Sequence, residues 1–213
     1  ISSDLGVGSE NHFRLPFWME SLNWAKQGIA NKKSRRISRL LEIDELATPI
    51  GGKLLEKPRK AAMFCAHLKE PRKSLYEALS KIMPTEGFGP AFAADIAHHD
   101  TSGFFKDDIL ADFAVNLCPE NSLYPGYCTE KIVEAFGSGC LPVTWTDPNV
   151  RADFNPDAFV NAHDFAATGY ENGLREALAP ARIAAFAEQP LFLQRPNIEP
   201  LAEFLGRVIA DTR

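Results

Sequence analysis

The residues whose types and spacing could do chemistry lie between Glu120 and Lys131 (ENSLYPGYCTEK). Thr129 can cap the helix that we expect to follow, and free N–H groups at a helix start favour a diphosphate. Lys131 adds positive charge in a first turn where lysine opposes the helix dipole, which indicates an anionic partner. Glu130 could hold ribose hydroxyls, and Tyr127 could stack or hydrogen-bond. The pattern favours a nucleotide site, although a capped helix with a solvated Glu-Lys pair also explains it.

The elements around this stretch predict a parallel sheet. Phe113 to Cys118 (FAVNLC) is strand-like, Thr129 to Ser138 places apolar residues on one helical face, and Leu141 to Trp145 is again strand-like. Gly139 suits the end of the helix. A strand, a loop, a helix and a strand form a right-handed βαβ unit, and such sheets bind ligands at the carboxyl ends of their strands.

The rest of the chain extends this pattern into an α/β, Rossmann-like, doubly wound fold. A strand is predicted in Ala61 to His67, followed by a helix from Arg72 to Met83. We expect a turn at Gly87 to Pro90, before a further apolar stretch at 91–94. The remaining expected elements are a short strand, Ala158 to Asn161, and helices from Tyr170 to Leu178, Ala181 to Glu188 and Glu199 to Asp211. The aromatic segment from His12 to Trp24 is predicted to pack on another part of the protein.

Gly126 to Phe165 (GYCTEKIVEAFGSGCLPVTWTDPNVRADFNPDAFVNAHDF) resembles the donor-binding motif of glycosyltransferase family 10, the α-1,3/4-fucosyltransferases, and above all its bacterial members. In that family an E-N-S/T triplet and a Y-x-T-E-K segment line the GDP-fucose pocket. The matching residues here are Glu120, Asn121, Tyr127, Thr129, Glu130 and Lys131. The family also has an arginine that opens an upstream helix and binds the diphosphate, which places Arg72 in the site. Pro119 stands where the family usually has phenylalanine.

The resemblance implies the C-terminal half of a GT-B glycosyltransferase and inverting transfer of fucose from GDP-fucose to an oligosaccharide hydroxyl. The implied acceptor is N-acetylglucosamine or glucose, in α-1,3 linkage. Lys131 and Arg72 would stabilise the leaving diphosphate, whereas Glu130 and Asn121 would position ribose and sugar, so we predict Lys131, Arg72 and Glu130 as catalytic. The general base would come from the other domain. The alternatives are a nucleotide-sugar-binding module without catalysis and a glycosyltransferase that uses another nucleotide sugar.

This resemblance also sets the expected domain organisation. Residues 1–58 are predicted to be a junction segment or a remnant of the acceptor-side domain, and residues 59–213 the Rossmann-like GDP-fucose-binding domain. The chain opens at Ile1 without a methionine, so we expect it to be a piece of a longer protein.

Composition and the remaining motifs exclude several function classes. A net charge of −5 argues against a general nucleic-acid binder. Without an Asp-x-Asp motif we expect no metal requirement, and the neighbouring His98, His99 and Asp100 are poorly placed to share a metal. The basic run from Lys32 to Arg39 is either a solvated face or a peripheral contact with phosphate or an inner-membrane surface. Four widely spaced cysteines predict buried free thiols and a cytoplasmic setting.

Overall fold

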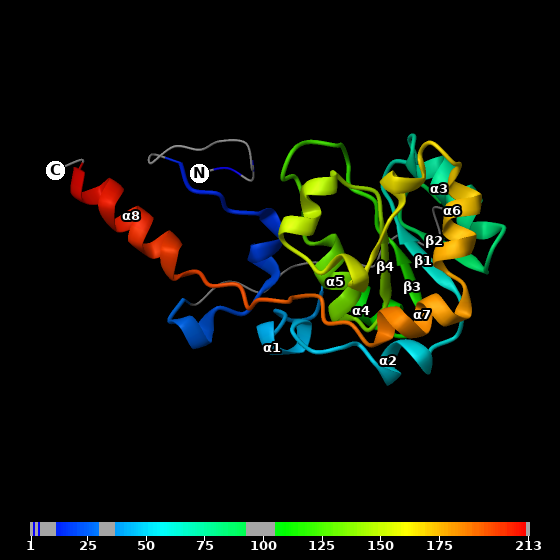
Figure 1. Ribbon diagram of the computed structural model, residues 1–213, viewed down its shortest axis with the longest axis horizontal. Coiled ribbons are helices and arrows are strands. Elements are labelled where there is room, and N and C mark those ends of the chain that lie inside the picture. Colours follow the sequence, from blue (N-terminus) through cyan, green and yellow to red (C-terminus); the bar gives the residue numbers. More distant parts are fainter. Residues whose placement is uncertain (1, 3, 5–11, 30–36, 93–104, 212–213) are drawn as a thin grey trace.

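The computed structural model describes residues 2, 4, 12–29, 37–92 and 105–211, and its centre is a five-stranded sheet (Figure 1). The strands are β1 (Ala61–Phe64), β2 (Thr85–Phe88), β3 (Val115–Leu117), β4 (Leu141–Thr144) and β5 (Val160–Asn161). They lie in the order β2-β1-β3-β4-β5, and each neighbouring pair is parallel. This confirms the predicted parallel α/β sheet.

Helices cover both faces of the sheet. The longer helices are α3 (Arg72–Ser80), α5 (Lys131–Gly137), α6 (Tyr170–Ala177), α7 (Pro180–Ala187) and α8 (Glu199–Asp211), of which α8 extends away from the sheet (Figure 1). The short helices are α1 (Ile43–Leu46), α2 (Gly52–Leu55) and α4 (Lys106–Leu110). Figure 1 shows that α3 and α6 lie side by side on one face of the sheet, and that α4 and α5 lie side by side on the other face. The predicted strands at β1, β3, β4 and β5 are therefore confirmed, as are the helices α3, α5, α6, α7 and α8.

The strand β2 differs from the sequence-based expectation, which placed a turn at Gly87 to Pro90. Gly87 lies inside β2 opposite Met63, and the turn begins only at Gly89, whose φ is +97°. The sequence of β2 is TEGF, and none of its side chains is fully buried because it lies at the sheet edge. An edge strand with this composition lacks the apolar pattern by which strands are recognised.

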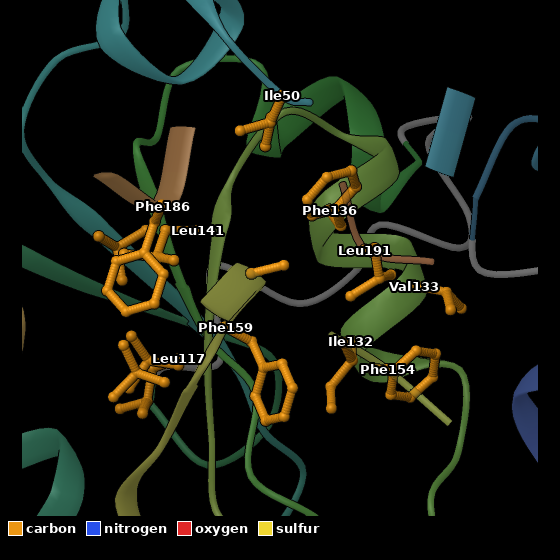
Figure 2. Packing of buried hydrophobic residues seen from close by; sticks show 14 of the residues in the cluster. Ile50, Leu117, Ile132, Val133, Phe136, Leu141, Phe154, Phe159, Phe186 and Leu191 are labelled. Atoms are coloured by element: carbon orange, nitrogen blue, oxygen red, sulfur yellow. The ribbon is translucent and has the colours of Figure 1, made fainter. Parts of the chain in front are cut away.

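The core is built by strand alternation and by α5. Successive strand residues face opposite sides of the sheet, so Leu117 and Leu141 share a face. Figure 2 shows them grouped with Phe186 of α7, while Ile132 of α5 lies in a second group with Phe154. The helix α5 thus anchors its first turn to the core, which fixes the chain at the end of β3.

The aromatic segment near the N-terminus packs on the C-terminal part of the protein. The ring of Trp18 lies 5.3 Å from those of Phe154 and Phe192, measured between centroids. Arg14 forms an ion pair of 2.7 Å with Asp153, which also accepts a hydrogen bond of 3.1 Å from the Trp18 indole. The predicted packing of this segment is confirmed, although the division at residue 58 stays a prediction.

Gly173 provides a test of packing between α6 and the turn before it. A Cβ at Gly173 would lie 2.2 Å from the ring of Phe165, a distance that real Cβ atoms do not show. We expect Gly173→Ala to lower the free energy of unfolding by about 1–3 kcal/mol, as overpacking does. Urea denaturation followed by circular dichroism measures this.

The matched control is Gly206→Ala in α8, where the added Cβ meets no described atom within 4 Å. This exposed helical position should gain up to about 1 kcal/mol from the higher helix propensity of alanine. Equal effects of the two substitutions would contradict the packing proposed at Gly173.

Candidate active site

A cavity of about 670 Å³ opens at the carboxyl ends of β1, β2 and β3. This is the place where, in the strand order 2-1-3-4-5, the connections from neighbouring strands diverge and a ligand can enter. The lining residues are Met63, Phe64, Cys65, Ala66, His67, Lys69, Arg72, Phe88, Gly89, Pro90, Lys106, Asn116, Leu117, Cys118, Pro119, Asn121, Glu130 and Lys131. The cavity therefore lies where parallel sheets bind ligands.

Four of the predicted site residues line this cavity. Arg72 opens α3, and its guanidinium donates hydrogen bonds to the side-chain oxygen of Asn121 and, at 3.3 Å, to the carbonyl of His67. Glu130 and Lys131 lie at the start of α5, with 3.6 Å between Glu130 Oε1 and Lys131 Nζ. Residues from two different βα units thus meet as the sequence predicted.

The other three predicted residues lie outside the lining, and Glu120 is the most buried of them. The Glu120 carboxylate is 1% exposed and accepts hydrogen bonds from the Thr129 N–H at 2.7 Å and from Lys131 Nζ at 2.9 Å. The Thr129 hydroxyl lies 2.9 Å and 3.0 Å from the two Glu120 oxygens. Glu120 and Thr129 therefore hold Lys131 in place, and their own contact with a ligand stays a prediction.

The expectation that Thr129 caps α5 is wrong. Glu130 occupies the N-cap position, and no side chain caps the helix. The Thr129 hydroxyl bonds the buried carboxylate instead, because hydrogen bonds to a charged acceptor are the stronger ones. Gly139, with φ of +75°, does follow the C-cap of α5 as predicted.

Tyr127 is not among the residues that line the cavity, and it is half-buried. Its ring contacts Phe17 edge to face at 6.1 Å, and its carbonyl accepts a hydrogen bond of 3.2 Å from the Thr146 hydroxyl. The structure therefore places Tyr127 against the N-terminal segment, and its role toward a ligand stays a prediction.

Three polar lining residues, Lys69, Lys106 and Asn116, were missed by sequence reasoning. Lys106 of α4 forms an ion pair of 3.1 Å with Glu134 of α5, which is fully buried. Asn116, in the middle of β3, is 1% exposed. A polar residue inside the apolar run FAVNLC was a signal for Asn116, whereas nothing near Lys106 in the sequence indicates a partner 28 positions away.

The known proteins most informative for this site are fucosyltransferases. The sequence profile described as Glycosyltransferase family 10 (fucosyltransferase) C-term matches residues 54–173. The chain belongs to this family. It is also 40% identical over 97 residues to the alpha-(1,3)-fucosyltransferase FucT of Helicobacter pylori, a match that covers 44% of this chain and 19% of that protein.

Solved fucosyltransferase structures share the fold of this family 10 domain. An α1,3-fucosyltransferase crystal structure matches 97% of this chain and 67% of its own, with a TM-score of 0.65 and 22% identity. A second one, solved with GDP-fucose, matches 74% of this chain and 48% of its own, with a TM-score of 0.58 and 27% identity. The predicted Rossmann-like C-terminal half of a GT-B glycosyltransferase is confirmed.

Metal and membrane features of the family 10 chain can be reported for the described residues. Within them no three His, Cys, Asp or Glu side chains form a metal-binding group, and no helix is long and apolar enough to cross a membrane. His98, His99 and Asp100 lie outside the described residues, as do residues 32–36 of the basic run. Arg39, at the end of that run, pairs with Glu45 at 2.7 Å.

All four cysteines are buried free thiols, as predicted. Burial raises the pKa of Cys118 from its ordinary value of 9.0 to about 12 and that of Cys140 to about 11. Burial also raises the pKa of Cys128 well above 9.0. The thiol of Cys118, although it lines the cavity, is therefore protonated and a poor nucleophile at neutral pH.

The Thr129 hydroxyl supports the buried carboxylate, so its removal should be costly. We expect Thr129→Val to lower the free energy of unfolding by about 1.5–3 kcal/mol, the range for hydrogen bonds to charged groups. Thr129→Ser keeps the hydroxyl and should lose about 1 kcal/mol or less, for one methyl group. Urea denaturation of both variants tests this, and equal losses would show that the hydroxyl contributes nothing.

The raised pKa of Cys118 predicts a loss of stability in alkali. Above about pH 9 the thiol ionises in the unfolded chain but not in the folded protein, so the folded state loses up to about 1.4 kcal/mol per pH unit. The loss continues until pH approaches the folded pKa of about 12. Cys118→Ala lacks this contribution. Urea denaturation from about pH 8 to pH 11 should therefore show the variant gaining relative to wild type as pH rises, and a constant difference would refute the shift.

Proposed function

We propose that this domain binds GDP-fucose and serves as the donor side of an inverting α-1,3-fucosyltransferase. The observation that carries the proposal is the meeting of Arg72, Asn121, Glu130 and Lys131 around one cavity at the carboxyl edge of the sheet. One of the similar solved structures is an α1,3-fucosyltransferase with GDP-fucose. The match covers a fifth of the curated relative, so the activity of the whole protein is part of this proposal.

The diphosphate is expected between Arg72 and Lys131. The Arg72 guanidinium is half-buried at the cavity rim, and Lys131 approaches from the other βα unit. Charge-assisted hydrogen bonds to phosphate are short and strong, and arginine can make two of them in parallel. These two cations could stabilise the leaving GDP without a metal ion, so we propose metal-independent transfer.

We expect Glu130 to accept hydrogen bonds from ribose hydroxyls, and the support is that this residue lines the same cavity beside Lys131. Asn121 would then orient the sugar next to Arg72. Both assignments would hold the nucleotide sugar at its two ends, and fixing the orientation of a bound substrate lowers the barrier.

In the proposed reaction, an acceptor hydroxyl oxygen bonds to the anomeric carbon of fucose on the face opposite the diphosphate. The bond between that carbon and the diphosphate oxygen breaks, and GDP leaves with the electron pair. Arg72 and Lys131 stabilise the negative charge that develops on GDP. A carboxylate of the acceptor-side domain takes the hydroxyl proton. The acceptor is proposed to be N-acetylglucosamine or glucose in an oligosaccharide.

Two rival proposals share the cavity. The domain could bind GDP-fucose without transferring it, since the base belongs to the other domain, or it could use a different nucleotide sugar. A contact between the basic run at Lys32 to Arg39 and a membrane surface is independent of all three.

Calorimetric titration with GDP tests the proposal, with UDP as the competitor for specificity. We expect GDP to bind more tightly than UDP, and Arg72→Ala and Lys131→Ala each to weaken GDP binding about 10- to 100-fold, which corresponds to about 1.5–3 kcal/mol. Lys73→Ala, an exposed lysine one position from Arg72, is the matched control and should bind as wild type.

Arg72→Ala is the cleaner variant, because Lys131→Ala also leaves the buried Glu120 carboxylate without its cation. Thermal unfolding therefore accompanies each titration. A folded Arg72→Ala variant that binds GDP as tightly as wild type would refute the placement of the diphosphate.

A further inference from the structure

Asn116 is a buried amide without a partner inside the cavity. Its side chain lines the cavity from the central strand β3, and the residue is 1% exposed. Neither its Nδ2 nor its Oδ1 has a hydrogen-bond partner among the described residues. Since buried polar groups are nearly always paired in native proteins, an amide with both atoms unpaired needs an explanation.

The other two buried asparagines of the described chain show that this is not a general feature of the fold. The Asn155 amide donates to the Pro190 carbonyl at 2.9 Å, and that of Asn161 donates to the Thr146 carbonyl at 3.0 Å. The side-chain oxygens of Asn155 and Asn161 also accept hydrogen bonds, each from a backbone N–H group. The structure thus satisfies the asparagines away from the cavity and leaves unpaired the one that lines it.

The walls near Asn116 are flat and apolar. Alternation along β3 puts Asn116 on the same sheet face as Cys118, and its register partner Ala62 shares that face with Phe64. The rings of Phe64 and Phe88 lie parallel within 20°, with centroids 5.1 Å apart, and both residues line the cavity. A flat ligand with a polar edge would match this combination.

We propose that Asn116 reads the nucleobase of the bound nucleotide, by hydrogen bonds from its amide to the polar edge of the base. The inference rests on the donor site proposed above. An amide presents a donor and an acceptor side by side, and guanine presents the complementary pair at N1–H and O6. A phosphate oxygen would satisfy only Nδ2 and leave Oδ1 unpaired, so the diphosphate is the poorer partner.

The charges of the cavity separate the two ends of the ligand. Arg72 and Lys131 take the diphosphate, and the nearer cation on the Asn116 side, Lys106, is already paired with Glu134 at 3.1 Å. Lys69, the remaining lysine of the lining, is exposed and belongs to the loop that leads into α3 and Arg72, so we assign it to the diphosphate end. The base consequently lies toward Phe64 and Asn116.

Nuclear magnetic resonance of the ¹⁵N-labelled protein tests this contact directly, with GDP and inorganic pyrophosphate as the two probes. The side-chain NH₂ signals of Asn116 are assigned by their loss in Asn116→Leu, a variant of similar shape. We expect GDP to shift them and pyrophosphate to leave them unchanged. The side-chain NH₂ signals of Asn155, bonded far from the cavity to Pro190, are the internal control and should not move.

The affinities of the same variant supply a second readout. Asn116→Leu should weaken GDP binding about tenfold or more, through the loss of two hydrogen bonds, and keep the pyrophosphate affinity within about twofold. The ligand-free variant should unfold at or above the wild-type temperature, because it no longer buries an unpaired amide.

Each other result overturns the inference in a distinguishable way. If GDP shifts the Lys131 backbone signal but not the Asn116 side chain, or if Asn116→Leu binds GDP as wild type, the donor site stands and the base contact is wrong. Equal weakening of GDP and pyrophosphate would place Asn116 at the diphosphate instead. If GDP shifts no signal at all, the donor site and the base contact both fail. Should Asn116→Leu not fold, the Asn116 side-chain NH₂ signals are assigned in the wild type through their scalar couplings to the Asn116 backbone in ¹³C,¹⁵N-labelled protein, and their shifts with GDP decide.

Discussion

The buried carboxylate of Glu120 is the interaction on which the geometry of the site depends. Glu120 follows β3, and its backbone N–H donates to the carbonyl of Trp145, just after β4. Its carboxylate oxygens accept hydrogen bonds from Thr129, which precedes α5, and from Lys131, the first residue of α5. A carboxylate that is 1% exposed is costly unless it is paired and hydrogen-bonded. The loop can therefore close only in the arrangement that gives Glu120 these partners, and this arrangement also points Lys131 at the cavity.

The cavity depends on a second constraint, which is the parallel sheet itself. Arg72 and Lys131 are separated by 59 positions, yet each opens the helix that follows a strand end. Because parallel strands end at the same edge of the sheet, α3 and α5 both begin at that edge. Arg72 of α3 can therefore donate a hydrogen bond to Asn121, which lies in the loop between β3 and α5. The β1–α3 unit thus supplies Arg72 and the β3–α5 unit supplies Lys131. Neither unit has to hold both cations against their mutual repulsion.

Sequence patterns were sufficient where a local rule and the tertiary structure agree. The apolar runs at β1, β3 and β4 are buried on both sides, so their composition alone indicates strands. The strand β2 was missed because its edge position permits the sequence TEGF. The cap assigned to Thr129 was wrong because an acceptor nine positions earlier outcompetes the local backbone. The sequence did not indicate Lys106 as a lining residue, because its partner Glu134 lies on another helix.

The two faces of the sheet differ in the polarity of their buried side chains. On the face toward α3, α6 and α7, the strand residues Met63, Leu117 and Val143 are apolar and at most 1% exposed. The opposite face carries Asn116 in the same strand as Leu117, and the Lys106–Glu134 pair bridges the two helices that cover it. Polar groups buried on this second face cost stability, which the buried apolar side chains of the first face offset. This domain therefore holds an unpaired amide at the centre of its sheet while the opposite face supplies the apolar packing.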